Sequence, residues 1–124
     1  MNPLRRQPTD KELLKVLEVC QLIRKLEPAE AKVNELPLQT LTVLMYVASH
    51  NGCHKQAMEE DLVMSKASGS RNTDWLARFH RLGRPGLNLI TKEVDRSDRR
   101  RTTLKLTRKG KDLVQQITRI LYDN

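Results

Sequence analysis

A short polar segment near the C-terminal end places the strongest constraint on the fold. Residues 95–101 contain four arginines and two aspartates. They separate residues 87–94 from Thr102–Leu106, two segments whose apolar and β-branched side chains are typical of strands. The pattern predicts a β-hairpin with a basic tip, in which Leu104 and Leu106 face inward.

The residues before the hairpin predict four helices. A capping box formed by Thr9 and Glu12 marks the start of the first helix. Pro37 suits the first turn of the second, and Ser65 or Ser68 can cap the fourth. The predicted helices cover residues 9–26, 38–50, 56–62 and 65–82.

Two of the expected helices carry apolar positions that favour a partner chain. The helix over residues 9–26 is apolar on more than one side, which indicates burial against another chain. A last helix is capped by Thr107, and its apolar stripe also suits a partner helix. The stripe consists of Leu113, Val114, Ile117, Ile120 and Leu121. In the fourth helix, Leu76 and Phe79 are expected on the buried face, with Trp75 at its margin.

Length and composition predict one small domain with an aliphatic core. The chain has 124 residues, and one Trp, two Tyr and one Phe make up its aromatic content. No apolar run approaches the roughly 20 residues that span a bilayer, and the N-terminal residues do not resemble a secretory signal. The two cysteines, Cys20 and Cys53, lie far apart and lack metal-ligand spacing. We therefore expect a cytoplasmic protein with reduced thiols and no membrane partner.

The excess of positive charge lies entirely in the C-terminal half. Residues 1–62 contain 8 basic and 9 acidic residues, whereas residues 63–124 contain 15 basic and 6 acidic residues. A localised basic surface favours a polyanion such as nucleic acid, because binding releases the counterions that surround phosphates. A solvated basic face that only aids solubility is the alternative.

The order of elements predicts a winged helix-turn-helix domain, mainly α-helical with a small β-hairpin wing. A helix roughly 10–12 Å wide fits a DNA major groove about 12 Å wide. The start of the fourth helix is small and polar, and Gly69 would permit a close approach to the bases. The residues expected to contact DNA from this helix are Ser65, Lys66, Ser68, Ser70, Arg71 and Asn72. The hairpin tip would reach the neighbouring minor groove.

Residues 95–110 resemble the wing of MarR-type transcriptional regulators. That wing reads D-x-x-D-R-R, a few residues, and then L-x-L-T-x-x-G, and the resemblance extends over residues 36–113. It implies that Asp98 orients Arg100, which enters the minor groove of double-stranded DNA. Arg96, Arg99 and Arg101 would serve the minor groove and the phosphates.

The resemblance also implies a homodimer on a near-palindromic operator. Residues 9–27 and 107–122 would form the dimerisation helices, and residues 36–106 would form the winged-helix lobe. A two-fold dimer places its recognition helices about one DNA turn apart, roughly 34–36 Å. The resemblance does not identify a small-molecule effector.

The sequence leaves alternatives to this prediction. The basic wing could dock an acidic protein surface in an adaptor, or the chain could bind nucleic acid without sequence preference. His50, Cys53, His54 and His80 do not follow a recognised zinc pattern, and neither cysteine lies in a clear redox-sensor environment. The sequence contains no recognisable combination of catalytic residues. We therefore expect a protein that is not an enzyme and needs no metal or cofactor.

Overall fold

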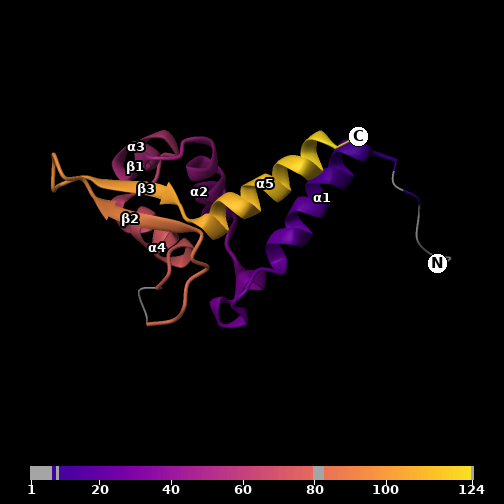
Figure 1. Cartoon of the computed structure of the whole chain (residues 1–124), viewed down its shortest axis with the longest axis horizontal. Coiled ribbons are helices and arrows are strands. Elements are labelled where there is room, and N and C mark those ends of the chain that lie inside the picture. Colours follow the sequence, from indigo (N-terminus) through magenta and orange to yellow (C-terminus); the bar gives the residue numbers. More distant parts are fainter. Residues whose placement is uncertain (1–6, 8, 80–82, 124) are drawn as a thin grey trace.

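The computed structural model describes residues 7, 9–79 and 83–123. It consists of a two-helix arm and a lobe from which a β-hairpin extends (Figure 1). The elements in chain order are α1 (Lys11–Arg24), the 3-10 turns η1 (Ala29–Ala31) and η2 (Val33–Glu35), α2 (Leu38–Ser49), β1 (Cys53–His54), α3 (Lys55–Asp61), α4 (Lys66–Leu76), β2 (Ile90–Val94), β3 (Thr102–Leu106) and α5 (Arg108–Tyr122). The structure thus confirms the predicted fold class.

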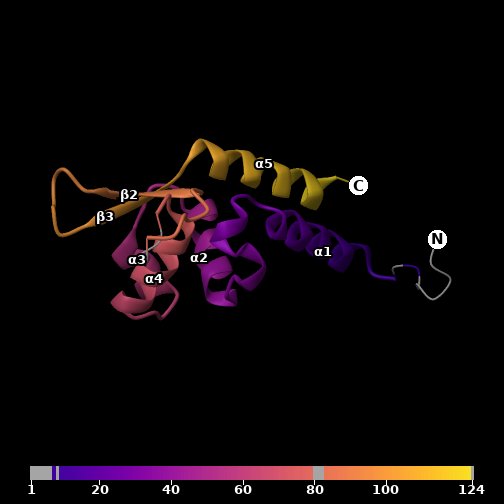
Figure 2. The ribbon, with the colours of Figure 1, turned by 90° about the horizontal axis from the view of Figure 1, so that it is seen from below.

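The arm consists of α1 and α5, which lie side by side at the end of the molecule opposite the hairpin (Figures 1 and 2). Lys15 Nζ donates to the carbonyl of Leu121 over 3.2 Å, so the start of α1 lies against the end of α5. Ile23 of α1 is buried, as are Leu113 and Ile117 of α5. The two helices therefore share one end of the hydrophobic core.

The lobe packs α2, α3 and α4 against a three-stranded antiparallel sheet of order β1-β3-β2. Its centre is aliphatic, as expected, and includes Val43, Leu44, Met58, Leu76 and Leu104. The central strand β3 matches its predicted bounds, and Leu106 is half-buried beside the fully buried Leu104. The strand β1 was not predicted, because two residues carry no detectable alternation.

The helix α1 begins differently from the prediction. Asp10, not Thr9, is the N-cap, and its carboxylate accepts from the backbone N–H of Leu13 over 3.0 Å. A carboxylate both satisfies a free N–H group and complements the positive end of the helix dipole, which explains why it caps in place of the hydroxyl. The remaining ends of α1, α2 and α3 lie within two residues of the predicted positions.

The fourth helix is shorter than predicted and ends at Leu76. Its expected end at residue 82 lies outside the described residues. Ala77 is already extended, and Phe79 is exposed and pairs in an isolated β-bridge with Pro85. The prediction that Phe79 lies on a buried helical face is therefore wrong, because the helical spacing stops before that residue. Trp75 is half-buried at the core margin, as predicted.

Residues 87–89, which we call the strap, are not part of β2 as predicted. Leu87 and Leu89 are fully buried, and Asn88 has a left-handed backbone with φ of 55°. The strap N–H groups donate to the carbonyls of residues 75–77 at the end of α4. Their hydrogen bonds therefore go to a helix terminus, which explains why an apolar segment of strand-like composition does not join the sheet.

The start of α5 packs against the strap. Thr107 caps the helix, as predicted, by accepting from the N–H of Gly110 over 3.0 Å. A Cβ atom on Gly110 would lie 2.1 Å from the carbonyl oxygen of Leu89. Glycine is therefore required here so that the helix can approach the strap backbone.

We expect Gly110→Ala to destabilise the protein by about 1–3 kcal/mol, because backbone rather than a flexible side chain blocks the new methyl group. Urea denaturation followed by circular dichroism measures this change. Lys111→Ala, at the exposed next position, should stay within about 0.5 kcal/mol of the unsubstituted protein. Equal effects of the two substitutions would contradict the steric argument.

Candidate nucleic-acid interface

The helices α3 and α4 form a helix-turn-helix with a strained turn. Val63 in this turn has φ of 52° and is 93% exposed. Ser65 follows as the N-cap of α4 and accepts from the N–H of Ser68 over 3.0 Å. This position of Ser65 fixes the start of the helix, which the sequence left open between Ser65 and Ser68.

A buried ion pair fills the contact between α3 and α4. Lys55 Nζ lies 2.5 Å from Glu59 Oε2, and it also donates to the carbonyl of Lys66 over 3.4 Å. A Cβ atom on Gly69 would lie 2.0 Å from Glu59 Oε2. Gly69 thus allows α4 to approach the carboxylate of α3, which corrects the prediction that Gly69 serves an approach to bases.

Ser68 and Asn72 face the lobe interior and join α4 to α2. The hydroxyl of Thr40 donates to Asn72 Oδ1 over 2.6 Å, and Ser68 Oγ donates to Gln39 Oε1 over 3.0 Å. Asn72 Nδ2 also donates to the carbonyl of Ser68 over 2.8 Å. Their burial contradicts the prediction that these two side chains contact DNA. An inward polar network competes for the same hydrogen-bonding groups that could have read bases.

The outer face of α4 holds the other predicted residues. Ser65, Lys66 and Arg71 are exposed, and Ser70 is half-buried. Asp74, on the side toward the sheet, accepts from Lys92 of β2 over 2.7 Å. This ion pair joins α4 to the first strand of the hairpin, and the cations Lys66 and Arg71 lie on the exposed surface of α4.

The hairpin tip, residues 95–101, is held by short-range hydrogen bonds. Asp95 Oδ1 accepts from the N–H and the hydroxyl of Ser97, over 2.9 and 2.7 Å. These bonds lower the pKa of Asp95 below its ordinary value, since they favour the charged carboxylate. The N–H of Asp95 donates to the carbonyl of Arg101 and closes the loop.

Asp98 holds Arg100 from within the same turn. Asp98 Oδ1 accepts from the backbone N–H and from Nε of Arg100, over 3.0 and 3.1 Å. The side chain of Arg100 is nevertheless 91% exposed. The hydrogen bond from the Arg100 guanidinium lowers the pKa of Asp98, so the carboxylate stays charged throughout the neutral range. Arg101 Nε lies 3.6 Å from the same carboxylate, and Arg96 and Arg99 are exposed.

A groove of about 320 Å³ lies between the helix-turn-helix and the wing. The residues that line it come from α3, the first residue of α4, and the wing. They are Lys55, Gln56, Glu59, Lys66, Arg100, Arg101 and Thr102. Four of these side chains are cationic, and one, Glu59, is a carboxylate. Glu59 is paired with one of the four cations, Lys55. Lys55 and Gln56 were not predicted as site residues, because they lie on α3, ahead of the helix that was expected to contact DNA.

The described histidines and cysteines do not gather into one cluster, and His80 lies outside the described residues. His50 stacks on Tyr46 with ring centroids 4.2 Å apart, and His54 Nδ1 lies 4.0 Å from Asp95 Oδ2. Burial raises the pKa of the half-buried Cys53 thiol, which disfavours the reactive thiolate. Within the described residues, three potential metal-binding side chains of the His, Cys, Asp or Glu type do not gather anywhere.

The helix-turn-helix, the hairpin and the two-helix arm define a winged helix-turn-helix fold of the MarR type. A search of protein-family models finds no match, and neither does a search of curated proteins. Solved structures do match. S. aureus MepR in complex with DNA has a TM-score of 0.61 at 21% identity, over 87% of this chain and 73% of MepR.

Two further structures support the same fold. MarR itself has a TM-score of 0.58 at 18% identity, over 87% of this chain and 70% of MarR. A MarR transcriptional regulator from Methanosarcina mazei Go1 has the same score and identity, over 87% of this chain and 69% of that regulator. Among the described residues, no helix combines the length and apolar character that crossing a membrane requires.

The strained turn predicts a stabilising substitution. A β-branched residue at positive φ costs about 1–2 kcal/mol, and asparagine tolerates this conformation better. Val63→Asn should therefore stabilise the protein by about 1 kcal/mol in urea denaturation. The matched control is Val94→Asn, at an exposed strand residue outside the left-handed region. It should not stabilise, and a gain at both positions would point to polarity rather than strain.

Proposed function

We propose that this protein is a dimeric, sequence-specific DNA-binding transcriptional regulator and not an enzyme. The observation that carries the proposal is the groove in which the start of α4 and the wing meet. It brings Lys66, Arg100 and Arg101 from separate elements to one basic surface. Double-stranded DNA is a polyanion whose major and minor grooves lie side by side. These two grooves match the pairing of a helix with a hairpin in this chain.

The solved relatives support the same partner. MepR, which shares the fold, was solved as a DNA complex. By analogy, α4 of this chain would enter the major groove, with Arg71 and Ser70 near base edges and Ser65 and Lys66 near phosphates. Arg100 would enter the adjoining minor groove.

The arginines of the wing would have two different roles, insertion into the minor groove and neutralisation of phosphates. Arg100, held by Asp98, would insert into the minor groove in a fixed orientation, which reduces the entropy lost on binding. Arg96, Arg99 and Arg101 would neutralise phosphates. The expected result is tight binding with a strong dependence on salt.

The arm supports a homodimer. Leu13, Val16 and Leu17 of α1 are at least half exposed, and Leu121 and Tyr122 at the end of α5 are also exposed. A second copy would cover these apolar side chains and place two α4 helices on one face of a duplex. The DNA site would then be an inverted repeat, with half-sites about one turn, roughly 34 Å, apart.

Selection of bound duplexes from a random pool tests the proposal directly. We expect enrichment of an inverted repeat. Enrichment of no sequence, with uniform binding to all duplexes, would support non-specific packaging. Absence of duplex binding would favour the adaptor, in which the basic wing docks an acidic protein.

Two substitutions separate the charge of Arg100 from its orientation. Arg100→Ala should weaken binding and reduce the slope of log K against log salt by about one unit. Asp98→Asn keeps the guanidinium but weakens its support. It should preserve that slope while narrowing the difference in affinity between the selected site and random DNA. Fluorescence anisotropy at several salt concentrations measures both effects. An unchanged affinity for Arg100→Ala would show that the wing does not contact DNA.

A charge in the arm should dissociate the dimer. Leu17→Asp would bury a carboxylate in the apolar interface, which is strongly unfavourable without a partner. Sedimentation velocity should then report a species of 14.4 kDa in place of one of twice that mass. Glu18→Ala, at the exposed next position of α1, should remain dimeric. Dissociation by both substitutions would show that the loss of the dimer is not specific to a charge placed at Leu17.

A further inference from the structure

The strap connects the recognition helix to the arm through consecutive main-chain groups. Its three N–H groups donate to the carbonyls of residues 75–77, over 2.8–3.1 Å. Its three carbonyls accept from the start of α5: from the N–H and hydroxyl of Thr107, and from Lys109 Nζ, over 2.7–3.0 Å. Each strap residue is thus bonded to α4 on one side and to α5 on the other.

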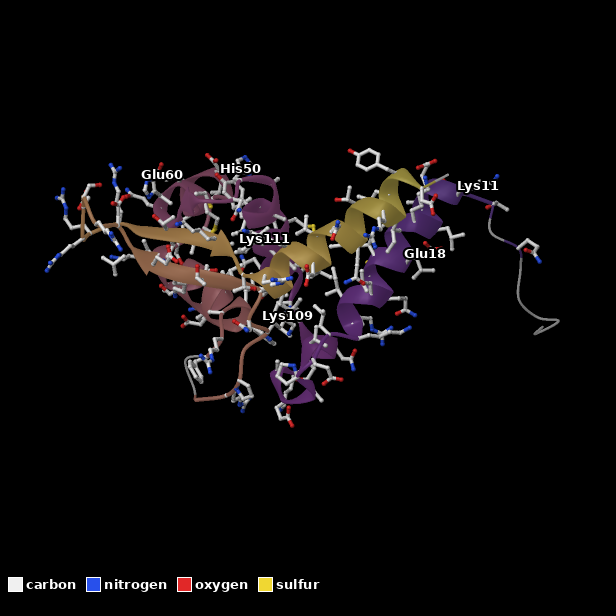
Figure 3. All side chains as sticks on the ribbon, in the orientation of Figure 1. Lys11, Glu18, His50, Glu60, Lys109 and Lys111 are labelled. Atoms are coloured by element: carbon white, nitrogen blue, oxygen red, sulfur yellow. The ribbon has the colours of Figure 1, made fainter. Side chains whose placement is uncertain are left out.

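Lys109 makes a second bond that reaches the other arm helix. Its Nζ donates both to the carbonyl of Leu87 in the strap and to the carbonyl of Glu27, three residues past the end of α1. Burial lowers the pKa of this ammonium group, since the partly enclosed site disfavours its charge. Figure 3 shows Lys109 at the junction of arm and lobe, with Lys111 nearby on the same helix.

A second contact joins the segment after α1 to the lobe. Trp75 Nε1 donates to the carbonyl of Ala31 over 2.9 Å, so the segment after α1 is attached to the end of α4 as well. Thr107 and Gly110 hold α5 to the strap without help from Lys109. The separate contribution of Lys109 is therefore to connect the end of α1 to α5 and the strap at one point.

We propose that Lys109 is a positioning residue that fixes the angle between the α1–α5 arm and the recognition helix α4. Loss of its two bonds leaves the lobe intact and lets the arm reorient about the strap. In a dimer joined through its arms, this angle determines the distance between the two recognition helices. That last step rests on the function proposed above, whereas the fixed angle within one chain does not.

The angle can be measured without DNA by pulsed electron paramagnetic resonance. Nitroxide labels at Glu18→Cys in α1 and Glu60→Cys in α3, both exposed and both shown in Figure 3, report the distance between arm and lobe. The native Cys20 and Cys53 are replaced by alanine, and labelled chains are diluted with unlabelled ones to suppress distances between protomers. Lys109→Met should broaden or shift the distance distribution. The control Lys111→Met loses the same charge and should not.

A second label pair distinguishes positioning from general support. Glu60→Cys with Lys105→Cys spans α3 and β3 within the lobe, and Lys109→Met should leave this distribution unchanged. An unchanged arm-to-lobe distribution in Lys109→Met would overturn the proposal. A change in the within-lobe pair, or an equal change in Lys111→Met, would also overturn it, because the effect would then be loss of lobe structure or of charge.

Binding to the selected DNA extends the test to the dimer. Lys109→Met should bind the selected inverted repeat about tenfold more weakly and favour a different spacing between half-sites. Its affinity for a duplex with a single half-site should not change. If the unsubstituted protein selects no inverted repeat, the proposed function fails, and the label distances still decide whether Lys109 fixes the arm.

Discussion

The hydrogen bonds of the strap are the constraint on which the arrangement of the molecule depends. A helix terminus leaves its last carbonyls without partners inside the helix. In this chain the carbonyls at the end of α4 accept from residues 87–89, whose own carbonyls accept from the start of α5. Burial of Leu87 and Leu89 excludes water, so breaking these bonds would expose unsatisfied polar groups to an apolar surrounding. This three-residue segment therefore links α4, the hairpin and the arm, and the bonds from Trp75 to Ala31 and from Lys109 to Glu27 attach the segment after α1 to the same region.

Ion pairs at the edges of α4 complete its placement and determine which charges reach the surface. Lys55 pairs with Glu59 beneath the helix start, and Lys92 pairs with Asp74 near its end. The charge of each of these two lysines is thereby balanced by an acidic partner within the lobe. The exposed cations of α4 and the wing stay available to an external anion.

Local signals in the sequence predicted the parts of the fold that depend on neighbouring residues. The alternation of Thr102–Leu106 and the capping hydroxyl of Thr107 each act within a few residues, and both were correct. The direction of Ser68 and Asn72 depends instead on Thr40 and Gln39, about thirty residues earlier. A polar side chain at the start of a recognition helix has the same sequence pattern whether it faces DNA or a neighbouring helix. Periodicity therefore located the helix of the candidate site but could not say which side chains faced outward.

The pairing of Asp98 with Arg100 suggests why an acidic residue would lie in the surface that we propose for DNA binding. A carboxylate in the wing reduces the total attraction to phosphates, which acts on every duplex regardless of sequence. It also restricts the guanidinium to one direction while leaving it 91% exposed. A side chain held in one orientation would bind a minor groove of the wrong width only weakly, because it cannot turn toward another phosphate. In the proposed complex with DNA, the wing would thus have a lower non-specific affinity but a greater sensitivity to the shape of the minor groove.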